Sequence, residues 1–246
     1  MITARARRFF IPPELICDNE TRLPDAEARH LRNVLRIREG ERVEVFDGKG
    51  GVWSGEVKFG DGEVFVCGLS TIYPRRQSDA ARLALAMAMI KPARFEWALE
   101  KATELGVDEI LPLYTKRSEI RISGEKISSR LARWDRITKE ASKQCLRLDV
   151  PRLCAPLEFH GFLSSAEYSI QNKILFYEKS NKQWLPDRTK AGGDTIICIG
   201  PEGGWTEDEI ESAKNSGCCV FSLGRRVLRA ETAAIAALSI FQHRMQ

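Results

Sequence analysis

Two glycine-containing segments near the C-terminal end hold the residues best suited to chemistry. The first, residues 199–205, reads Ile-Gly-Pro-Glu-Gly-Gly-Trp, and the second, residues 222–232, contains three arginines and one glutamate. Each follows a short apolar run with strand character and precedes a run with helix character. In open α/β sheets, ligands bind at turns of this kind. We therefore expect the two segments to form two walls of one ligand-binding pocket.

The glycine spacing excludes the two commonest nucleotide-binding loops. No Gly-Lys-Ser/Thr follows the first segment, so it is not a P-loop, and the GxGxxG fingerprint of dinucleotide-binding folds is absent. Taken alone, the first segment is also compatible with a purely structural turn. The second segment favours a ligand, because Leu223, Gly224, Val227 and Leu228 offer apolar and backbone contacts suited to an adenine.

The composition indicates an ordinary globular protein. Of 246 residues, 43% are hydrophobic and 29% are charged. No apolar run is long enough to cross a membrane, and no signal-peptide pattern follows Met1, so we expect a cytoplasmic protein. The seven cysteines include no CxxC pair, and we expect no metal site.

Basic residues are unevenly distributed. Residues 121–152 hold nine lysines and arginines against four acids, although the net charge is only +4. Such clustering indicates a phosphate-bearing partner, and solvated helix faces are an equally good explanation.

The first 72 residues predict a small β-rich domain that resembles a barrel. A helix is expected at 25–36, where apolar residues recur at spacings of three and four. Glycine-rich hairpin turns separate the later strands. The predicted strands are 8–11, 42–46, 52–57 and 63–69, and residues 73–79 form a linker.

The remainder alternates strands with helices, which predicts a parallel sheet. Strands are expected at 83–89, 107–113, 174–177, 195–199 and 219–223, and helices at 92–105, 126–148, after the capping box at Thr206, and at 231–244. The long helix at 126–148 is expected to present a basic ridge. The ridge consists of Arg133, Arg136, Lys139, Lys143 and Arg147.

The two glycine segments resemble the signature loops of the RsmE family, a group of SPOUT-superfamily methyltransferases. The resemblance extends along the whole chain, although Cys145-Leu146 departs from the small or polar residues usual in the family. The other matching residues are His30, Val34, Leu35, Arg36, Lys91, Arg94, Lys101, Glu104, Leu105, Gly106, Arg117, Ser118, Glu140, Gln144 and Arg147.

The resemblance implies an α/β fold with two domains: a PUA-like RNA-binding β-barrel, 1–72, and a SPOUT trefoil-knot methyltransferase domain, 73–246. It implies a homodimer that uses S-adenosylmethionine to methylate N3 of a uridine in 16S (small-subunit) ribosomal RNA. The expected substrate is ribosomal RNA within the assembled small subunit, and naked RNA is the alternative. The implied cofactor-binding residues are Leu175, Phe176, Ile199, Gly200, Pro201, Gly203, Gly204, Leu223, Gly224, Val227, Leu228 and Thr232.

Catalysis is expected to need a cation and a proton acceptor, because uracil N3 must lose its proton as the methyl group arrives. Arg229 is the expected cation, and Glu231 or Glu202 is the expected acceptor. For Glu231, an acid favoured by the helix N-terminus is the alternative. The expected RNA-binding residues are Arg5, Arg7, Arg8, His30, Arg32, Arg36, Lys91 and Arg94.

Two other functions fit the same pattern. One is a SPOUT methyltransferase that acts on a ribose 2′-hydroxyl or on transfer RNA. The other is a non-catalytic RNA-binding or ribosome-assembly factor, against which the intact glycine segments argue.

Overall fold

The computed structural model describes residues 7–17, 19–74, 81–168, 172–182 and 193–245. The chain divides into two units. The first contains residues 1–79 and 142–150, and the second contains residues 80–141 and 151–246. The first unit thus includes a short segment that the sequence analysis placed in the second domain.

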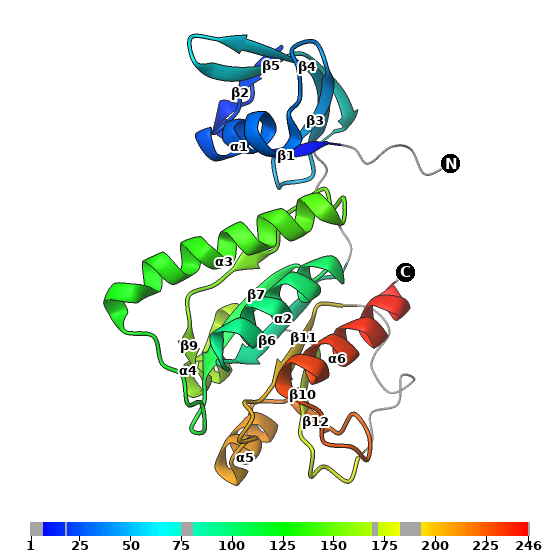
Figure 1. Ribbon diagram of the computed structural model, residues 1–246. Helices are drawn as coiled ribbons and strands as arrows, with labels where there is room; N and C mark the ends of the chain where they lie inside the picture. Colours follow the sequence, from blue (N-terminus) through cyan, green and yellow to red (C-terminus); the bar gives the residue numbers. More distant parts are fainter. Residues whose placement is uncertain (1–6, 18, 75–80, 169–171, 183–192, 246) are drawn as a thin grey trace. The chain divides into compact units, whose positions relative to one another are not determined.

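The first unit is built on a five-stranded sheet with the order β1-β3-β4-β5-β2 (Figure 1). β1 pairs with β3 in parallel, and the other pairs are antiparallel. The core includes alternating valines of the strands, such as Val43, Val45, Val64 and Val66. The strands are β1 (Arg8–Phe10), β2 (Glu20–Arg22), β3 (Arg42–Phe46), β4 (Val52–Gly60) and β5 (Glu63–Tyr73). The predicted β-rich unit is confirmed, with β2 as an additional strand.

The helix predicted at 25–36 is present, but its second half is wider than an α-helix. α1 (Asp25–Arg29) continues as a π-helix, η2 (His30–Leu35), which ends at Arg36 in the left-handed conformation, with φ 51°. π-Helical turns are rare and concentrate at functional sites. Sequence periodicity alone does not distinguish the two helix types.

The helix predicted at 126–148 ends earlier than expected. α3 (Gly124–Gln144) stops before Leu146, which adopts a left-handed conformation with φ 61°. Within the first unit, the buried Lys143 Nζ lies 2.9 Å from a carboxylate oxygen of Glu27. Arg147 Nε lies 3.1 Å from a carboxylate oxygen of Asp149. The prediction that Lys143 and Arg147 belong to an exposed basic ridge is therefore wrong.

The second unit is a parallel α/β layer structure, as predicted. Its sheet has the strand order β12-β10-β11-β6-β7-β8, with β9 pairing with β7, and every pair is parallel. The strands are β6 (Leu83–Ala88), β7 (Glu109–Tyr114), β8 (Arg152–Leu153), β9 (Leu157–Glu158), β10 (Asn172–Phe176), β11 (Thr195–Ile199) and β12 (Cys219–Phe221).

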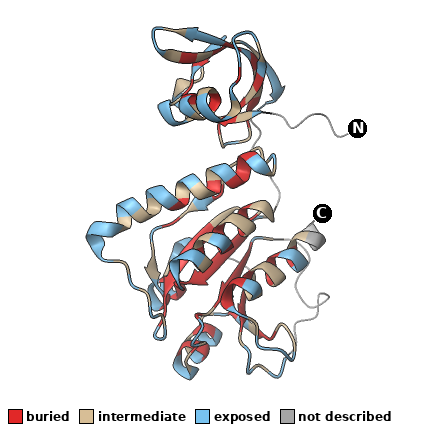
Figure 2. Ribbon diagram, viewed as in Figure 1, coloured by how far each residue is buried: buried red, intermediate tan, exposed pale blue. Residues whose placement is uncertain are grey.

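Helices cover both faces of this sheet (Figure 1). α2 (Pro92–Glu104), α3 and α6 (Ala230–Met245) share one apolar cluster, whereas α4 (Phe159–Ser164) and α5 (Glu207–Asn215) share the other. The central strands are buried along their length (Figure 2). Short 3-10 helices lie at Pro13–Leu15 and Ala166–Tyr168. Within the described residues, no helix is both long enough and apolar enough to span a membrane.

Candidate active site

The register of the sheet brings the two glycine segments together. Phe176 at the end of β10 is paired with Ile199 at the end of β11 and with Phe221 at the end of β12. Because the strands are parallel, the turns that follow them leave from the same edge. Both turns line one cavity of about 410 Å³. The expectation of one pocket with two walls is confirmed.

Most of the residues predicted to bind the cofactor line this cavity. They are Phe176, Ile199, Gly200, Pro201, Gly203, Gly204, Leu223, Gly224, Val227 and Leu228. Leu175 and Thr232 do not. Leu175 is buried in the cluster with α4 and α5, because successive residues of a strand point to opposite faces. Thr232 is exposed on α6.

The cavity has further lining residues, and of these the sequence analysis did not identify Glu178. Tyr177 and Glu178 follow β10 directly, Trp205 ends the first glycine segment, and Arg226 lies in the second. Glu178 places a carboxylate beside the backbone of Gly204, where a Cβ would lie 3.0 Å from its Oε1. In the sequence, the position of Glu178 immediately after an apolar strand was the signal that could have identified it as a cavity residue.

Gly200 lines the cavity, and it is also required for packing against Trp205. A Cβ at this position would lie 2.8 Å from the indole Nε1 of Trp205. That indole is buried, lies 4.6 Å from the Phe159 ring, centroid to centroid, and donates from Nε1 to the Phe176 carbonyl over 3.0 Å. The first glycine segment therefore folds against the aromatic core beneath the cavity.

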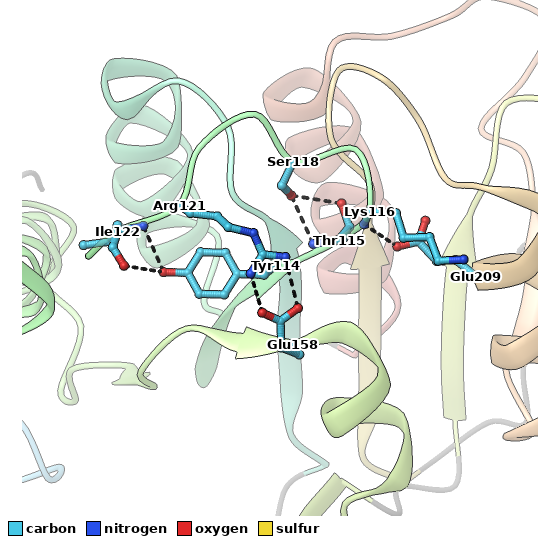
Figure 3. A network of polar contacts seen from close by, with 8 residues as sticks. All are labelled: Tyr114, Thr115, Lys116, Ser118, Arg121, Ile122, Glu158 and Glu209. Atoms are coloured by element: carbon cyan, nitrogen blue, oxygen red, sulfur yellow. Dashed lines mark hydrogen bonds and ion pairs between the residues drawn. The ribbon is translucent and has the colours of Figure 1, made fainter. Parts of the chain in front are cut away.

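The loop that follows β7 supports the first glycine segment from outside. The guanidinium of Arg117 donates to the Gly203 carbonyl over 2.9 Å. Glu209, buried at the start of α5, accepts from the Lys116 amide over 2.8 Å (Figure 3). It also accepts from the Thr206 amide over 2.9 Å. The latter contact belongs to the predicted capping box, which is confirmed. One carboxylate therefore fixes the loop and the helix start together.

The far end of that loop is anchored separately. The Ile122 amide donates to the Tyr114 hydroxyl over 3.2 Å (Figure 3). Arg121 lies 5.0 Å from the centre of the Tyr114 ring and pairs with both oxygens of Glu158. With both ends held, the loop gives Arg117 a fixed base from which to contact the glycine segment.

Three charged residues meet beside the cavity. Arg94 of α2 donates from Nη1 to Glu202 Oε1 over 2.6 Å, and its Nε lies 3.7 Å from Glu231 Oε1. Glu202 lines the cavity, whereas Glu231 does not. Glu231 is 9% exposed, and its Oε2 has no hydrogen-bond partner among the described residues. Arg229 lines the cavity with an exposed side chain.

Several residues predicted to bind RNA have partners within the protein. Arg8 contacts Glu44 and the Arg147 carbonyl, and its side chain is 5% exposed. Arg32 donates to the carbonyls of Gly62 and Glu63. Arg7 pairs with Glu41, and Arg94 pairs with Glu202 as described above. Arg8 and Arg32 thus stabilise the first unit, and no local sequence pattern indicates these contacts.

The remaining predicted RNA-binding residues are more accessible. Lys91 and Arg36 are exposed. His30 is half-buried, with its ring edge-on to Phe9 at a centroid distance of 6.4 Å. Arg5 lies outside the described residues.

Comparison with known proteins gives a consistent result. Residues 77–242 match the family model described as an RNA methyltransferase domain, and residues 23–66 match the model of an RNA methyltransferase PUA domain. The ribosomal RNA small subunit methyltransferase E of a Synechocystis species is 33% identical over 95% of this chain and 76% of its own length. The protein of the same name from Bacillus subtilis is 28% identical over 89% of this chain and 88% of its own length.

Solved structures resemble the whole chain. A methyltransferase E from Neisseria gonorrhoeae, bound to S-adenosylmethionine, has 31% identity and a TM-score of 0.82, covering 97% of each chain. A Legionella pneumophila protein in complex with the same cofactor has 31% identity and a TM-score of 0.88, covering 98% of each chain. Together with the two glycine segments and the cavity that they enclose, these matches show that the chain belongs to the ribosomal RNA small subunit methyltransferase E family.

Proposed function

We propose that the protein transfers a methyl group from S-adenosylmethionine to N3 of a uridine in 16S (small-subunit) ribosomal RNA. The observation that carries the proposal is the cavity between the two glycine segments, in a chain whose structural relatives of similar length hold this cofactor. The names of the relatives support the ribosomal substrate. The assembled subunit is the proposed form of that substrate.

The cavity suits this cofactor in size and chemistry. Its volume of about 410 Å³ falls among small-molecule pockets, which measure roughly 300–1,000 Å³. Phe176, Ile199 and Leu228 offer apolar surface for an adenine, and Glu178 and Glu202 offer negative charge for the cationic end. When bound, S-adenosylmethionine supplies an electrophilic methyl group on a positively charged sulfur. The protein residues then hold that methyl in line with the nucleophile, which accounts for much of the rate.

The charged residues at the cavity support proposed roles in the removal of the proton from uracil N3. Uracil N3 must lose its proton, and the negative charge that develops spreads onto the base carbonyl oxygens. Arg229 is an exposed cation on the cavity wall, and we propose that it stabilises that charge. Glu202 is the better candidate for the proton acceptor, because it lines the cavity and Glu231 does not. Glu231 lies in the first turn of α6, where the helix dipole favours an acid.

RNA binding is proposed to use the exposed part of the second glycine segment as well as the first unit. Arg225, Arg226 and Arg229 are exposed, and no ion pair to them occurs among the described residues. Val227 between them is 81% exposed. Arginines in this arrangement suit phosphates, which position RNA without reading its sequence. Replacing Arg225 and Arg226 by glutamine should reduce the dependence of RNA affinity on salt concentration.

The finer features of the family are proposed on the same basis. We propose a homodimer, because Trp97 on α2 and Ile240 on α6 are exposed apolar side chains on two helices that pack together. We also propose a trefoil knot near the cofactor cavity, a PUA-like domain at 1–72 followed by the methyltransferase domain at 73–246, and a cytoplasmic location where ribosomes assemble.

Mapping the modified nucleotide tests the proposal. Small-subunit RNA and transfer RNA from cells with and without the protein are digested separately and examined by mass spectrometry. The proposal predicts one 3-methyluridine that is present only with the protein. A protein-dependent methyl group on a ribose or on transfer RNA would favour the related SPOUT activities. Absence of any such methyl group, together with no saturable cofactor binding, would favour a non-catalytic RNA-binding factor.

A further inference from the structure

Arg94 links the two sides of the cavity through carboxylates from different parts of the chain. Glu202 belongs to the first glycine segment, and Glu231 belongs to the second, in the first turn of α6. The guanidinium of Arg94 lies 2.6 Å from Glu202 and 3.7 Å from Glu231, measured between the nearest nitrogen and oxygen atoms. The three side chains thus form a cluster beside the cavity, with Arg94 between the two acids.

The burial of Glu231 makes this cluster sensitive to the loss of the cation. Glu231 is 9% exposed, and its Oε2 lacks a hydrogen-bond partner among the described residues. A buried carboxylate is costly unless a charge or donors compensate it. Arg94 provides that compensation at Oε1. Without it, the two carboxylates would also repel each other, and α6 or the first glycine segment would have to move.

We infer that Arg94 is a positioning residue that holds both walls of the cofactor cavity through Glu202 and Glu231. The inference rests on the proposed function, since it takes the cavity as the S-adenosylmethionine site. It differs from the RNA contact that the sequence suggested for Arg94. It also gives Glu231 a structural partner in place of a direct role in proton transfer.

The geometry of the guanidinium is essential to this role. Arginine presents several donors in a rigid planar fork, and it uses different nitrogens for the two acids here. A lysine has one ammonium group and the same charge. Arg94→Lys should therefore keep RNA attraction but lose simultaneous contact with both carboxylates.

Calorimetric titration with S-adenosylmethionine tests the inference without requiring RNA or turnover. Arg94→Met should weaken cofactor affinity at least tenfold, and Arg94→Lys should give an intermediate loss. The double variant Arg94→Met/Glu231→Gln should recover part of the affinity, because the uncompensated buried charge is then removed. Circular dichroism verifies that each variant is folded at the assay temperature.

Arg133→Met is the matched control. Arg133 of α3 pairs with Glu96 of α2 at 2.6 Å, so the variant also removes an arginine–glutamate pair from α2 but leaves the cavity residues untouched. Its cofactor affinity should equal that of the wild type.

The outcomes separate the alternatives. Unchanged cofactor affinity in Arg94→Met would overturn the inference, and unchanged cofactor affinity with weaker, salt-dependent RNA binding would assign Arg94 to RNA instead. An equal loss of cofactor affinity in Arg94→Met and in Arg94→Met/Glu231→Gln would also overturn the inference. In that case, removal of the buried Glu231 charge would not restore any affinity. If the wild-type protein takes up no S-adenosylmethionine, the proposed function fails, and with it the inference that depends on this cofactor.

Discussion

Gly200→Ala tests whether the first glycine segment depends on the aromatic core beneath it. The added Cβ would lie 2.8 Å from Trp205 Nε1 and 3.0 Å from Cε2. Comfortable carbon contacts are about 3.5–4.0 Å, so the indole must move by at least about 0.7 Å. The ring is 2% exposed and is held by Phe159 and by its hydrogen bond to the Phe176 carbonyl. It therefore has little room to move.

The expected loss follows from these contacts. Overpacking a well-packed core costs about 1–3 kcal/mol, and a weakened buried hydrogen bond adds about 1 kcal/mol. The reduced entropy of the unfolded chain offsets about 0.4–1 kcal/mol. We predict a net loss of about 2 kcal/mol in the free energy of unfolding, measured by urea denaturation, and at least tenfold weaker S-adenosylmethionine binding.

Gly161→Ala serves as the control for this experiment. Gly161 lies in α4 with no atom within 4 Å of an added Cβ, so the variant should gain about 0.5–1 kcal/mol from helix propensity. Wild-type stability and cofactor affinity in Gly200→Ala would refute the packing argument. A loss of stability with unchanged cofactor affinity would refute only the link between Trp205 and the cavity.

Three further predictions concern charge and association. Glu178→Gln should weaken S-adenosylmethionine binding about two- to fivefold, as measured by calorimetry. The same change should weaken binding of the product S-adenosylhomocysteine less, because that product lacks the sulfonium charge. Equal losses of affinity for the two ligands would contradict the role of this carboxylate. The hydrogen bond from Arg133 holds the pKa of Glu96 in the folded protein below its ordinary value of about 4.3. The pair therefore stabilises the folded state at pH values above about 4.3, and this stabilisation is lost as the pH falls through the lower, folded-state pKa. The stability difference between wild type and Arg133→Met, from urea denaturation at a series of pH values, should therefore be constant near neutrality and vanish in acid, and a difference independent of pH would contradict this. Trp97→Glu should convert a dimer to a monomer in light scattering, and an unchanged mass would exclude Trp97 from the interface.

Local patterns predicted much of the fold. The bounds of β3 and β11 agree with the predicted residues 42–46 and 195–199, since each is a run of strand-forming residues that ends at a turn. The parallel sheet followed from the alternation of strands and helices, and it brought both glycine segments to one edge. The pocket was therefore predictable from turns and periodicity.

Features that depend on distant residues were not predictable. Cys145 and Leu148 continue the apolar periodicity of α3, but Lys143 binds Glu27, more than a hundred residues away, and the chain turns at Leu146. Apolar spacing alone could not reveal this end.

The candidate site shows the same limit. The side of the sheet to which Leu175 and Phe176 point depends on the position of β10 between two neighbouring strands. Likewise, no local pattern connects Arg94 with Glu202 and Glu231, because the three come from separate elements. The residue types at the cavity were therefore visible in the sequence, whereas their partners required the structure.

A methyl-transfer assay with isotopically labelled cofactor tests the central claim most directly. Purified protein is mixed with small ribosomal subunits lacking the modification and with S-adenosylmethionine that carries a ¹³C methyl group, and the RNA nucleosides are then analysed by mass spectrometry. The account predicts one heavy 3-methyluridine per subunit. Heavy methyl on a ribose or on another base, or cofactor binding without transfer to either assembled or naked RNA, would contradict it.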